Sequence, residues 1–166
     1  MLRHLKSLGL ATLASAVFVV PALAGPPWIS IELPVNPYDE SARGAFLLVH
    51  AFHHQTPTGF LVTGTAEGIV NGERRSITLK FDETSRGGVF ALKRMWPEEG
   101  AWTLVITVNQ APGDGATAMV DLGPDGQVAA IKVPTMQRGS WTVPAPVSLA
   151  DIGAALRARA ALAQRP

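Results

Sequence analysis

Three of the four histidines of the chain lie close together, at His50, His53 and His54, and they form its densest group of side chains capable of chemistry. Imidazole nitrogens are good ligands for zinc, copper and nickel. On an extended strand His50 and His54 would share one face and His53 would lie on the other. A bend at Gln55-Thr56-Pro57 would bring the three together. The cluster therefore predicts a copper or zinc site, with ordinary packing of His50 and solvation of the other two as the alternative.

Any further ligands would have to come from distant parts of the chain. The candidates are Glu67, Asp82, Glu83, Met95 and Met136. We expect no cofactor other than such a metal ion.

The chain offers few residues suited to catalysis. It contains no cysteine, and none of its serines lies in the Gly-x-Ser-x-Gly pattern that exposes the nucleophile of many hydrolases. Neighbouring carboxylates occur only in predicted turns, where solvated charge is their ordinary role: Asp39-Glu40, Asp82-Glu83 and Glu98-Glu99. We therefore expect no catalytic residues, and a binding or interaction module rather than a hydrolase with an unrecognised site.

Four tryptophans could present an aromatic surface to a sugar or a peptide. Trp102 is predicted to be buried, whereas Trp28, Trp96 and Trp141 lie at the ends of predicted elements. Packing in the core and at its rim is therefore expected, and Trp141 is expected to dock the segment around it.

Residues 1–24 have the order of features typical of a secretory signal peptide. A basic start with Arg3 and Lys6 precedes an apolar run, Pro21 ends that run, and small residues at 22 and 24 follow. The run is shorter than the roughly 20 apolar residues of a membrane-spanning helix, which would be the alternative. We expect cleavage between Ala24 and Gly25, and a periplasmic or secreted protein with no transmembrane segment in its mature chain.

The composition also restricts the partners. Loss of Arg3 and Lys6 with the signal would leave one more acidic than basic residue, and no basic stripe remains. A nucleic-acid partner is therefore not expected. The absence of cysteine means that the exported domain must be stabilised by packing rather than by disulfides. An unknown protein partner is the expectation that remains.

Short segments rich in Val, Ile, Thr and Phe alternate with turns rich in Gly, Pro, Asn and Asp, which is typical of a sandwich or barrel. Asn71-Gly72 predicts a hairpin with a type I′ turn. The core is expected to include Trp102, Leu104, Ile106 and Val108. The predicted strands cover residues 28–33, at an edge, 45–54, at the centre, and 60–66, 76–82, 89–94, 102–108, 116–122 and 127–133.

The last part of the chain changes character. Residues 134–147 contain one glycine and several prolines, and predict an ordered but irregular connection. Ser148 and Asp151 have the spacing of a capping box, and one amphipathic helix is expected over residues 148–166. Its apolar stripe comprises Leu149, Ile152, Leu156, Ala160 and Ala163.

The segment from Phe60 to Val108 carries Arg86-Gly87-Gly88-Val89-Phe90 and then the run Pro97-x-x-Gly100-x-Trp102-x-Leu104. It resembles the immunoglobulin-like β-sandwich modules of exported bacterial proteins, particularly those similar to FixH and YtkA, whose penultimate strands carry such a run. The resemblance implies a fold and no activity. A transthyretin-like or carboxypeptidase-regulatory-like sandwich fits the same pattern.

These observations together predict an all-β protein, an immunoglobulin-like antiparallel β-sandwich of about seven to nine strands with one C-terminal α-helix. A signal peptide over residues 1–24 would precede the sandwich domain of residues 25–147 and the helix of residues 148–166. We expect a non-catalytic, exported binding module, or alternatively a periplasmic copper- or zinc-binding protein that uses the histidine cluster.

Overall fold

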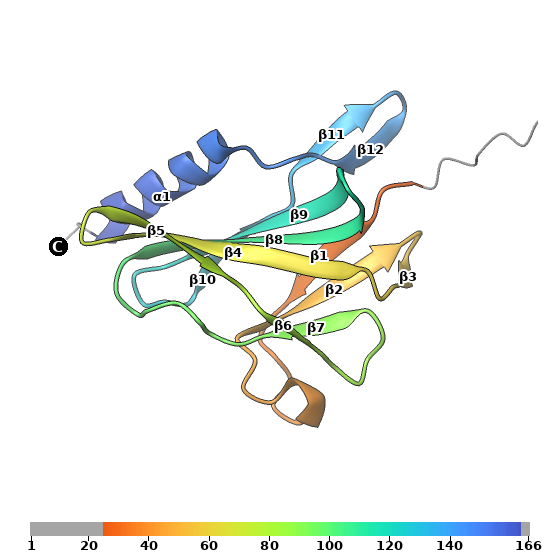
Figure 1. Ribbon diagram of the computed structural model, residues 1–166, viewed down its shortest axis with the longest axis horizontal. Coiled ribbons are helices and arrows are strands. Elements are labelled where there is room, and N and C mark those ends of the chain that lie inside the picture. The colour runs from red at the N-terminus through yellow and green to blue at the C-terminus, as the bar shows by residue number, and fades with distance from the viewer. Residues whose placement is uncertain (1–24, 164–166) are drawn as a thin grey trace, which may run out of the picture.

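The computed structural model describes residues 25–163. Most of them form two antiparallel β-sheets that pack face to face (Figure 1). The first sheet has the order β1 (Trp28–Glu32), β2 (Leu47–His53), β7 (Val89–Leu92) and β6 (Phe81–Glu83), with β3 (Thr56–Pro57) paired to β2. The second sheet has the order β10 (Val128–Lys132), β9 (Asp114–Leu122), β8 (Ala101–Ala111), β4 (Leu61–Val70) and β5 (Glu73–Thr78). The predicted sandwich is confirmed, and the predicted signal peptide lies outside the described residues.

The core lies between the two sheets and follows the alternation of the strands. On β8, Trp102 is 3% exposed and Leu104, Ile106 and Val108 are fully buried, as predicted. The central position predicted for the second strand is also confirmed, because β2 pairs with β1 on one side and with β7 on the other. Its residue Leu48 is buried on the outer face, beneath the loop that carries the 3-10 turn η1 (Glu40–Ala42).

The strand expected over residues 76–82 is divided between the two sheets. β5 ends at Thr78 in one sheet, and β6 begins at Phe81 in the other. Ile77, Leu79 and Phe81 nevertheless all pack on the same core, because the chain crosses from sheet to sheet at the margin of the sandwich. The alternation of apolar and polar residues correctly predicted which side chains face the core. The prediction that residues 76–82 form one continuous strand was wrong.

A further difference lies in residues 134–147, where an irregular connection was expected. The chain forms a separate hairpin of β11 (Thr135–Arg138) and β12 (Trp141–Pro144), which projects from the body (Figure 1). Trp141 is 75% exposed, so the expectation that it docks this segment is wrong. Val143 performs that role and is buried. With β3 and β6, this hairpin raises the number of strands above the predicted seven to nine.

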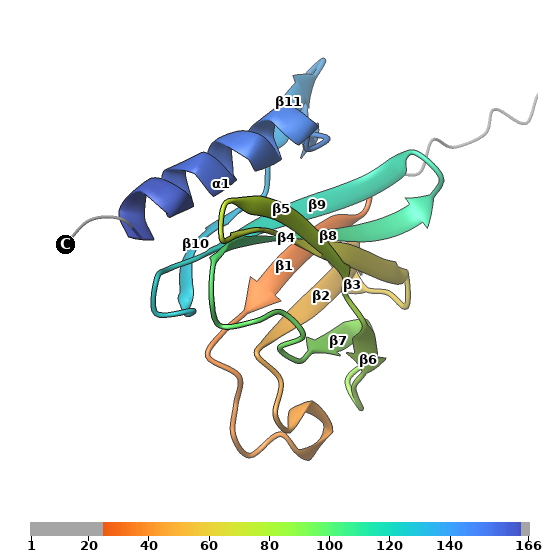
Figure 2. The same cartoon turned by 60° about the vertical axis from the view of Figure 1, so that its left-hand side comes forward.

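The helix α1 (Leu149–Ala163) lies across the outer face of the second sheet (Figure 2). Its first turn is closed by the predicted capping box, in which the Ser148 hydroxyl and backbone N–H both donate to Asp151 Oδ2, at 2.6 and 2.9 Å. Ile152 and Leu156 of the predicted stripe are buried against Met119, whereas Leu149 is 78% exposed and does not belong to the buried stripe. Within residues 25–163, no helix is long and apolar enough to cross a bilayer.

Candidate functional site

His50 is engaged by charged neighbours on the outer face of the first sheet. Its Nε2 lies 2.7 Å from Oε2 of Glu32 on the adjacent strand. The same carboxylate accepts hydrogen bonds from the guanidinium of Arg86, whose Nε lies 3.4 Å from Asp39. Asp39 has a lowered pKa, because the Ser41 hydroxyl donates to its carboxylate and Arg86 lies nearby. This network fastens the η1 loop to the sheet, which is a structural role for His50.

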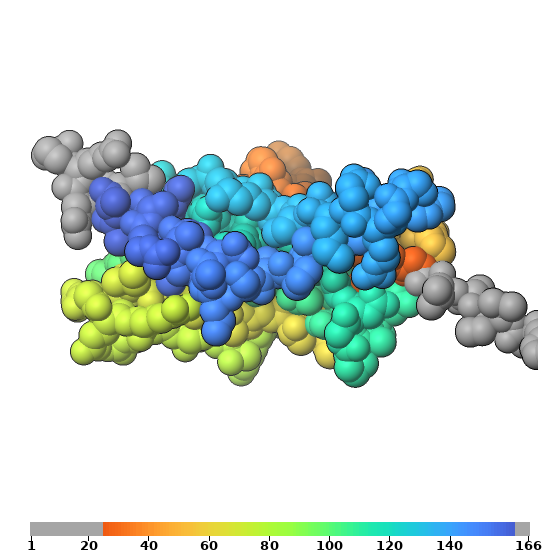
Figure 3. All heavy atoms as spheres, turned by 90° about the horizontal axis from the view of Figure 1, so that it is seen from above, coloured from red at the N-terminus to blue at the C-terminus, as the bar shows by residue number. Residues whose placement is uncertain are grey.

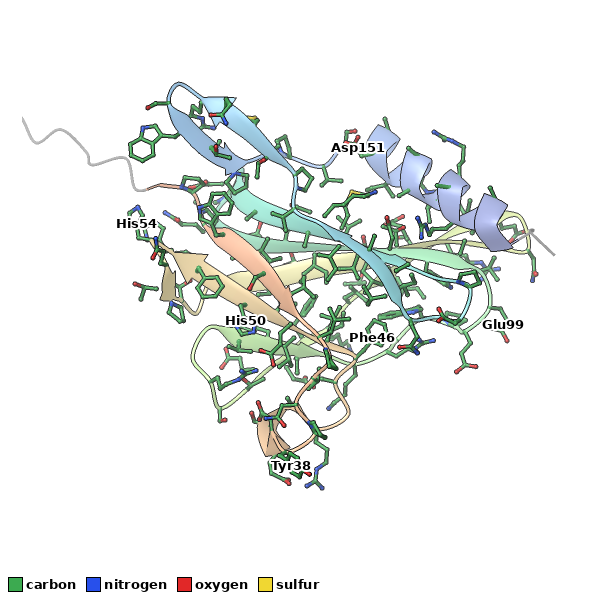
Figure 4. The ribbon with its side chains drawn as sticks, turned by 180° about the vertical axis from the view of Figure 1, so that it is seen from behind. Tyr38, Phe46, His50, His54, Glu99 and Asp151 are labelled. Atoms are coloured by element: carbon green, nitrogen blue, oxygen red, sulfur yellow. The ribbon has the colours of Figure 1, made fainter. Side chains whose placement is uncertain are left out.

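His53 and His54 lie together at another place, where the chain enters the fold. Their ring centroids are 4.1 Å apart. Nε2 of His53 lies 2.9 Å from the carbonyl oxygen of Gly25, the first described residue. In Figure 4, the labelled His54 lies at one end of the molecule, and His50 is well removed from it. The structure thus brings together two of the three predicted metal ligands and separates the third.

Three of the five distant residues considered as further ligands, Glu67, Asp82 and Met95, have other partners. Glu67 accepts a hydrogen bond from Ser76, and Asp82 accepts one from Lys93. Met95 accepts a hydrogen bond from the backbone N–H of Lys80. Over the whole described part of the chain, no three His, Cys, Asp or Glu side chains are close enough to share a metal ion.

Several serine hydroxyls have structural hydrogen-bond partners. Ser41 donates to Asp39, Ser85 to Ser41, and Ser76 to Glu67. Among residues 25–163, no serine hydroxyl is hydrogen-bonded to a histidine.

The outer edge of β10 stands apart from the other sheet edges. It lies at the end of its sheet, and only its inner edge is paired, with β9 (Figure 2). Its residues from Val128 to Ile131 are uncharged, and Ile131 is 39% exposed. A bulge lies near its start, between Val128 and Ala130, after which the pairing is regular. An edge strand of this composition is a ready template for another strand.

The terminal strands β1 and β6 of the first sheet and β5 of the second sheet carry the usual protection against such pairing. The protecting features are the charged Glu73, Arg74 and Arg75 of β5, the short length and the acidic Asp82 and Glu83 of β6, and the prolines 26, 27 and 34 that flank β1.

A groove of about 380 Å³ adjoins β10 on the side of α1. Its sheet side contains Met119 and Asp121 of β9, Lys132 of β10 and Pro134. Its helix side contains Asp151, three alanines and Arg159; the alanines are Ala154, Ala155 and Ala158. Because these alanine side chains are small, the helix leaves space above β9 and β10, and this space is the groove.

The two acids of the groove already have partners within the protein, whereas Nε of Arg159 has none. Asp121 is 1% exposed, accepts a hydrogen bond from Thr103 at 3.0 Å and lies 3.4 Å from Nζ of Lys132. Asp151 caps α1, and the hydrogen bonds from Ser148 hold its pKa below the usual range. Nε of Arg159, in contrast, is buried without a hydrogen-bond partner. Arg159 therefore contributes a positive charge to the wall of the groove.

Sequence reasoning missed both the groove and the edge of β10. One signal for the groove was present, since the three alanines recur at helical spacing on one side of the predicted helix. Asp121 was a second signal, since it interrupts an apolar strand. The position of β10 at an edge could not be read from the chain, because it depends on strand order.

Comparisons with known protein families, with curated proteins and with solved structures found no match to this chain. The likeness to FixH- and YtkA-type modules stays a prediction.

Proposed function

We propose that this protein is an exported, non-catalytic interaction module, and that it binds an extended segment of a partner protein by strand addition at β10. The observation that carries the proposal is the outer edge of β10, which is unpaired and uncharged up to Ile131. Main-chain hydrogen bonds supply affinity in this mode of binding, and pockets for alternate side chains supply specificity.

The groove beside β10 fits this mode of binding. A strand added to β10 would continue the second sheet at a spacing of about 4.8 Å, with every second side chain on the face that carries α1. Lys132 and Arg159 lie on that face, and Arg159 has an unpartnered Nε. Met119 adds an apolar surface. We therefore expect the partner segment to carry an aspartate or glutamate among apolar residues.

Selection of displayed random peptides against the mature chain tests the proposal. Enriched peptides should be extended and acidic, and their binding should be lost in the variant Ile131→Lys, because a charge on an edge strand opposes pairing. Leu61→Lys is the matched control, since Leu61 is 66% exposed on β4, away from the β10 edge, and this variant should bind normally.

The charged groove is tested with the same peptides. Arg159→Gln should weaken the binding of acidic peptides by about 1.5–3 kcal/mol, the usual value of a hydrogen bond to a charged group. Peptides in which the acid is replaced by its amide should bind both proteins alike. Enriched peptides that bind the Ile131→Lys variant as well as the parent would place the site elsewhere.

A further inference from the structure

The backbone of Gly25 lies against both stacked histidines. Its carbonyl oxygen is 2.9 Å from Nε2 of His53. A Cβ atom built on Gly25 would lie 3.2 Å from Nε2 of His54, so this imidazole also faces the residue. We propose that Gly25, once the signal peptide has been removed, joins His53 and His54 in a binding site for Cu²⁺.

Removal of the signal would change the chemistry of Gly25. Cleavage after Ala24 converts its peptide nitrogen, which has no lone pair to donate, into an α-amino group with an ordinary pKa of about 7.7–8.0. This amine nitrogen and the carbonyl oxygen of the same residue can chelate one metal ion. Pro26 follows and has no N–H, so the carbonyl oxygen rather than the next backbone nitrogen completes the ring.

The donors gathered here suit copper. They are one amine nitrogen, two imidazole nitrogens and one carbonyl oxygen, and a planar set of nitrogen and oxygen donors favours Cu²⁺, which also binds most tightly in the divalent series. Bonds of about 2.0 Å at right angles place adjacent donors about 2.8 Å apart. His53 Nε2 and Gly25 O, which are hydrogen-bonded at 2.9 Å, are already at about this spacing, so both could bind one ion with little movement.

The turn between β2 and β3 positions His54 beside Gly25. His54 and Gln55 form the turn between β2 and β3 with φ of 49° and 65°. Turns with positive φ at both positions favour Asn-Gly, which is the pair found at Asn71-Gly72 in this protein. Positive φ is uncommon outside glycine, and histidine is one of the residue types that adopt it more readily. The turn therefore holds the imidazole of His54 beside Gly25.

Titration with Cu²⁺ of an untagged chain that begins at Gly25, followed by calorimetry and electron paramagnetic resonance, tests the site. We expect micromolar or tighter binding with nitrogen splitting in the spectrum. His54→Gly should relieve the positive φ and keep the fold, yet weaken binding on the order of a hundredfold, because one of the linked donors is lost. His50→Ala is the matched control and should bind copper as the parent does, since His50 contacts Glu32.

A chain that begins at Ala24 tests the role of the amine without any change in a folded side chain. It should lose affinity as His54→Gly does, because the amine is moved one residue away. Equal copper affinity for the chains that begin at Ala24 and Gly25, a loss in His50→Ala as large as in His54→Gly, or binding only at millimolar copper would overturn the proposal. Tighter binding of Zn²⁺ than of Cu²⁺ would overturn the choice of metal. The site uses the predicted processing point but not the β10 surface, so the two proposals fail separately.

Discussion

Trp102 packs directly over the backbone of Gly68 on the neighbouring strand, and this contact explains the glycine. The two residues are paired in the register of β4 and β8. A Cβ atom on Gly68 would lie 2.7 Å from Cδ2 of the indole, and the indole Nε1 donates to Glu99 O at 2.9 Å, which fixes the ring. The indole therefore occupies the space that any side chain at position 68 would need.

Gly68→Ala should destabilise the protein by about 1–3 kcal/mol, the usual cost of overpacking a core. Gly59→Ala is the matched control, because a Cβ atom there meets nothing within 4 Å. Chemical denaturation of both variants measures the difference. Equal stability would mean that the indole can move, which its hydrogen bond to Glu99 opposes.

At the level of single residues, the sequence predicted the buried face of β8 but not the partners of the histidines. Burial follows from alternation along a strand, which is local information. The contact of His53 with Gly25 and that of His50 with Glu32 join residues far apart in the chain. They depend on the pairing of β1 with β2, which the sequence leaves open.

Among the elements, α1 is attached to the sandwich by only part of its predicted stripe. Leu156 is 2% exposed, whereas Leu149 is 78% exposed. Leu156→Ala should therefore cost about 2–5 kcal/mol in unfolding free energy. Leu149→Ala makes the same chemical change at a surface position and should change it by less than about 0.5 kcal/mol. A similar loss in both variants would contradict the packing of α1 described above.

The N-terminal cap of α1 should make the stability depend on pH. Hydrogen bonds from Ser148 lower the pKa of Asp151 in the folded protein below its unfolded value. The stabilisation is therefore present above the ordinary pKa of aspartate, and it is lost as the pH falls through the lowered value. Melting temperatures measured from neutral to acidic pH should show this loss.

Asp151→Asn is the control for this effect, because it removes the titrating group while keeping the size of the side chain. Its melting temperature should fall less with acid than that of the parent. Asp39 also has a lowered pKa and keeps its own contribution in both proteins. An identical acid dependence in the parent and the variant would show that the cap does not couple to folding.

The β11–β12 hairpin shows why some elements escape prediction from sequence. Its strands have four residues each, and all but Val143 and Pro144 are exposed. A strand with so little burial has no alternation of apolar and polar residues to reveal it. The crossing between β5 and β6 was missed for the opposite reason, because the alternation runs through it without interruption.

In the whole molecule, the outer faces of the two sheets are covered by different elements. The second sheet carries α1 on its outer face, and Figure 3 shows the helix and the hairpin together on one side of the body. The same sheet ends in the bare edge of β10 beside the groove. The class of fold can be predicted from the composition and the spacing of turns. The position of α1 on one sheet and the unpaired edge of β10 depend on strand order, which the sequence does not reveal. The proposed binding surface is therefore a property of the assembled sandwich.

Hydrogen exchange of a chain of residues 25–166, with and without a selected acidic peptide, tests the proposed function most directly. Strand addition predicts slower exchange of backbone amides in Val128–Lys132, with no change at the opposite edge, Glu73–Thr78. The protection should disappear in Ile131→Lys. Protection confined to the β11–β12 hairpin, or unchanged exchange throughout β10 while the peptide is bound, would contradict binding at this edge.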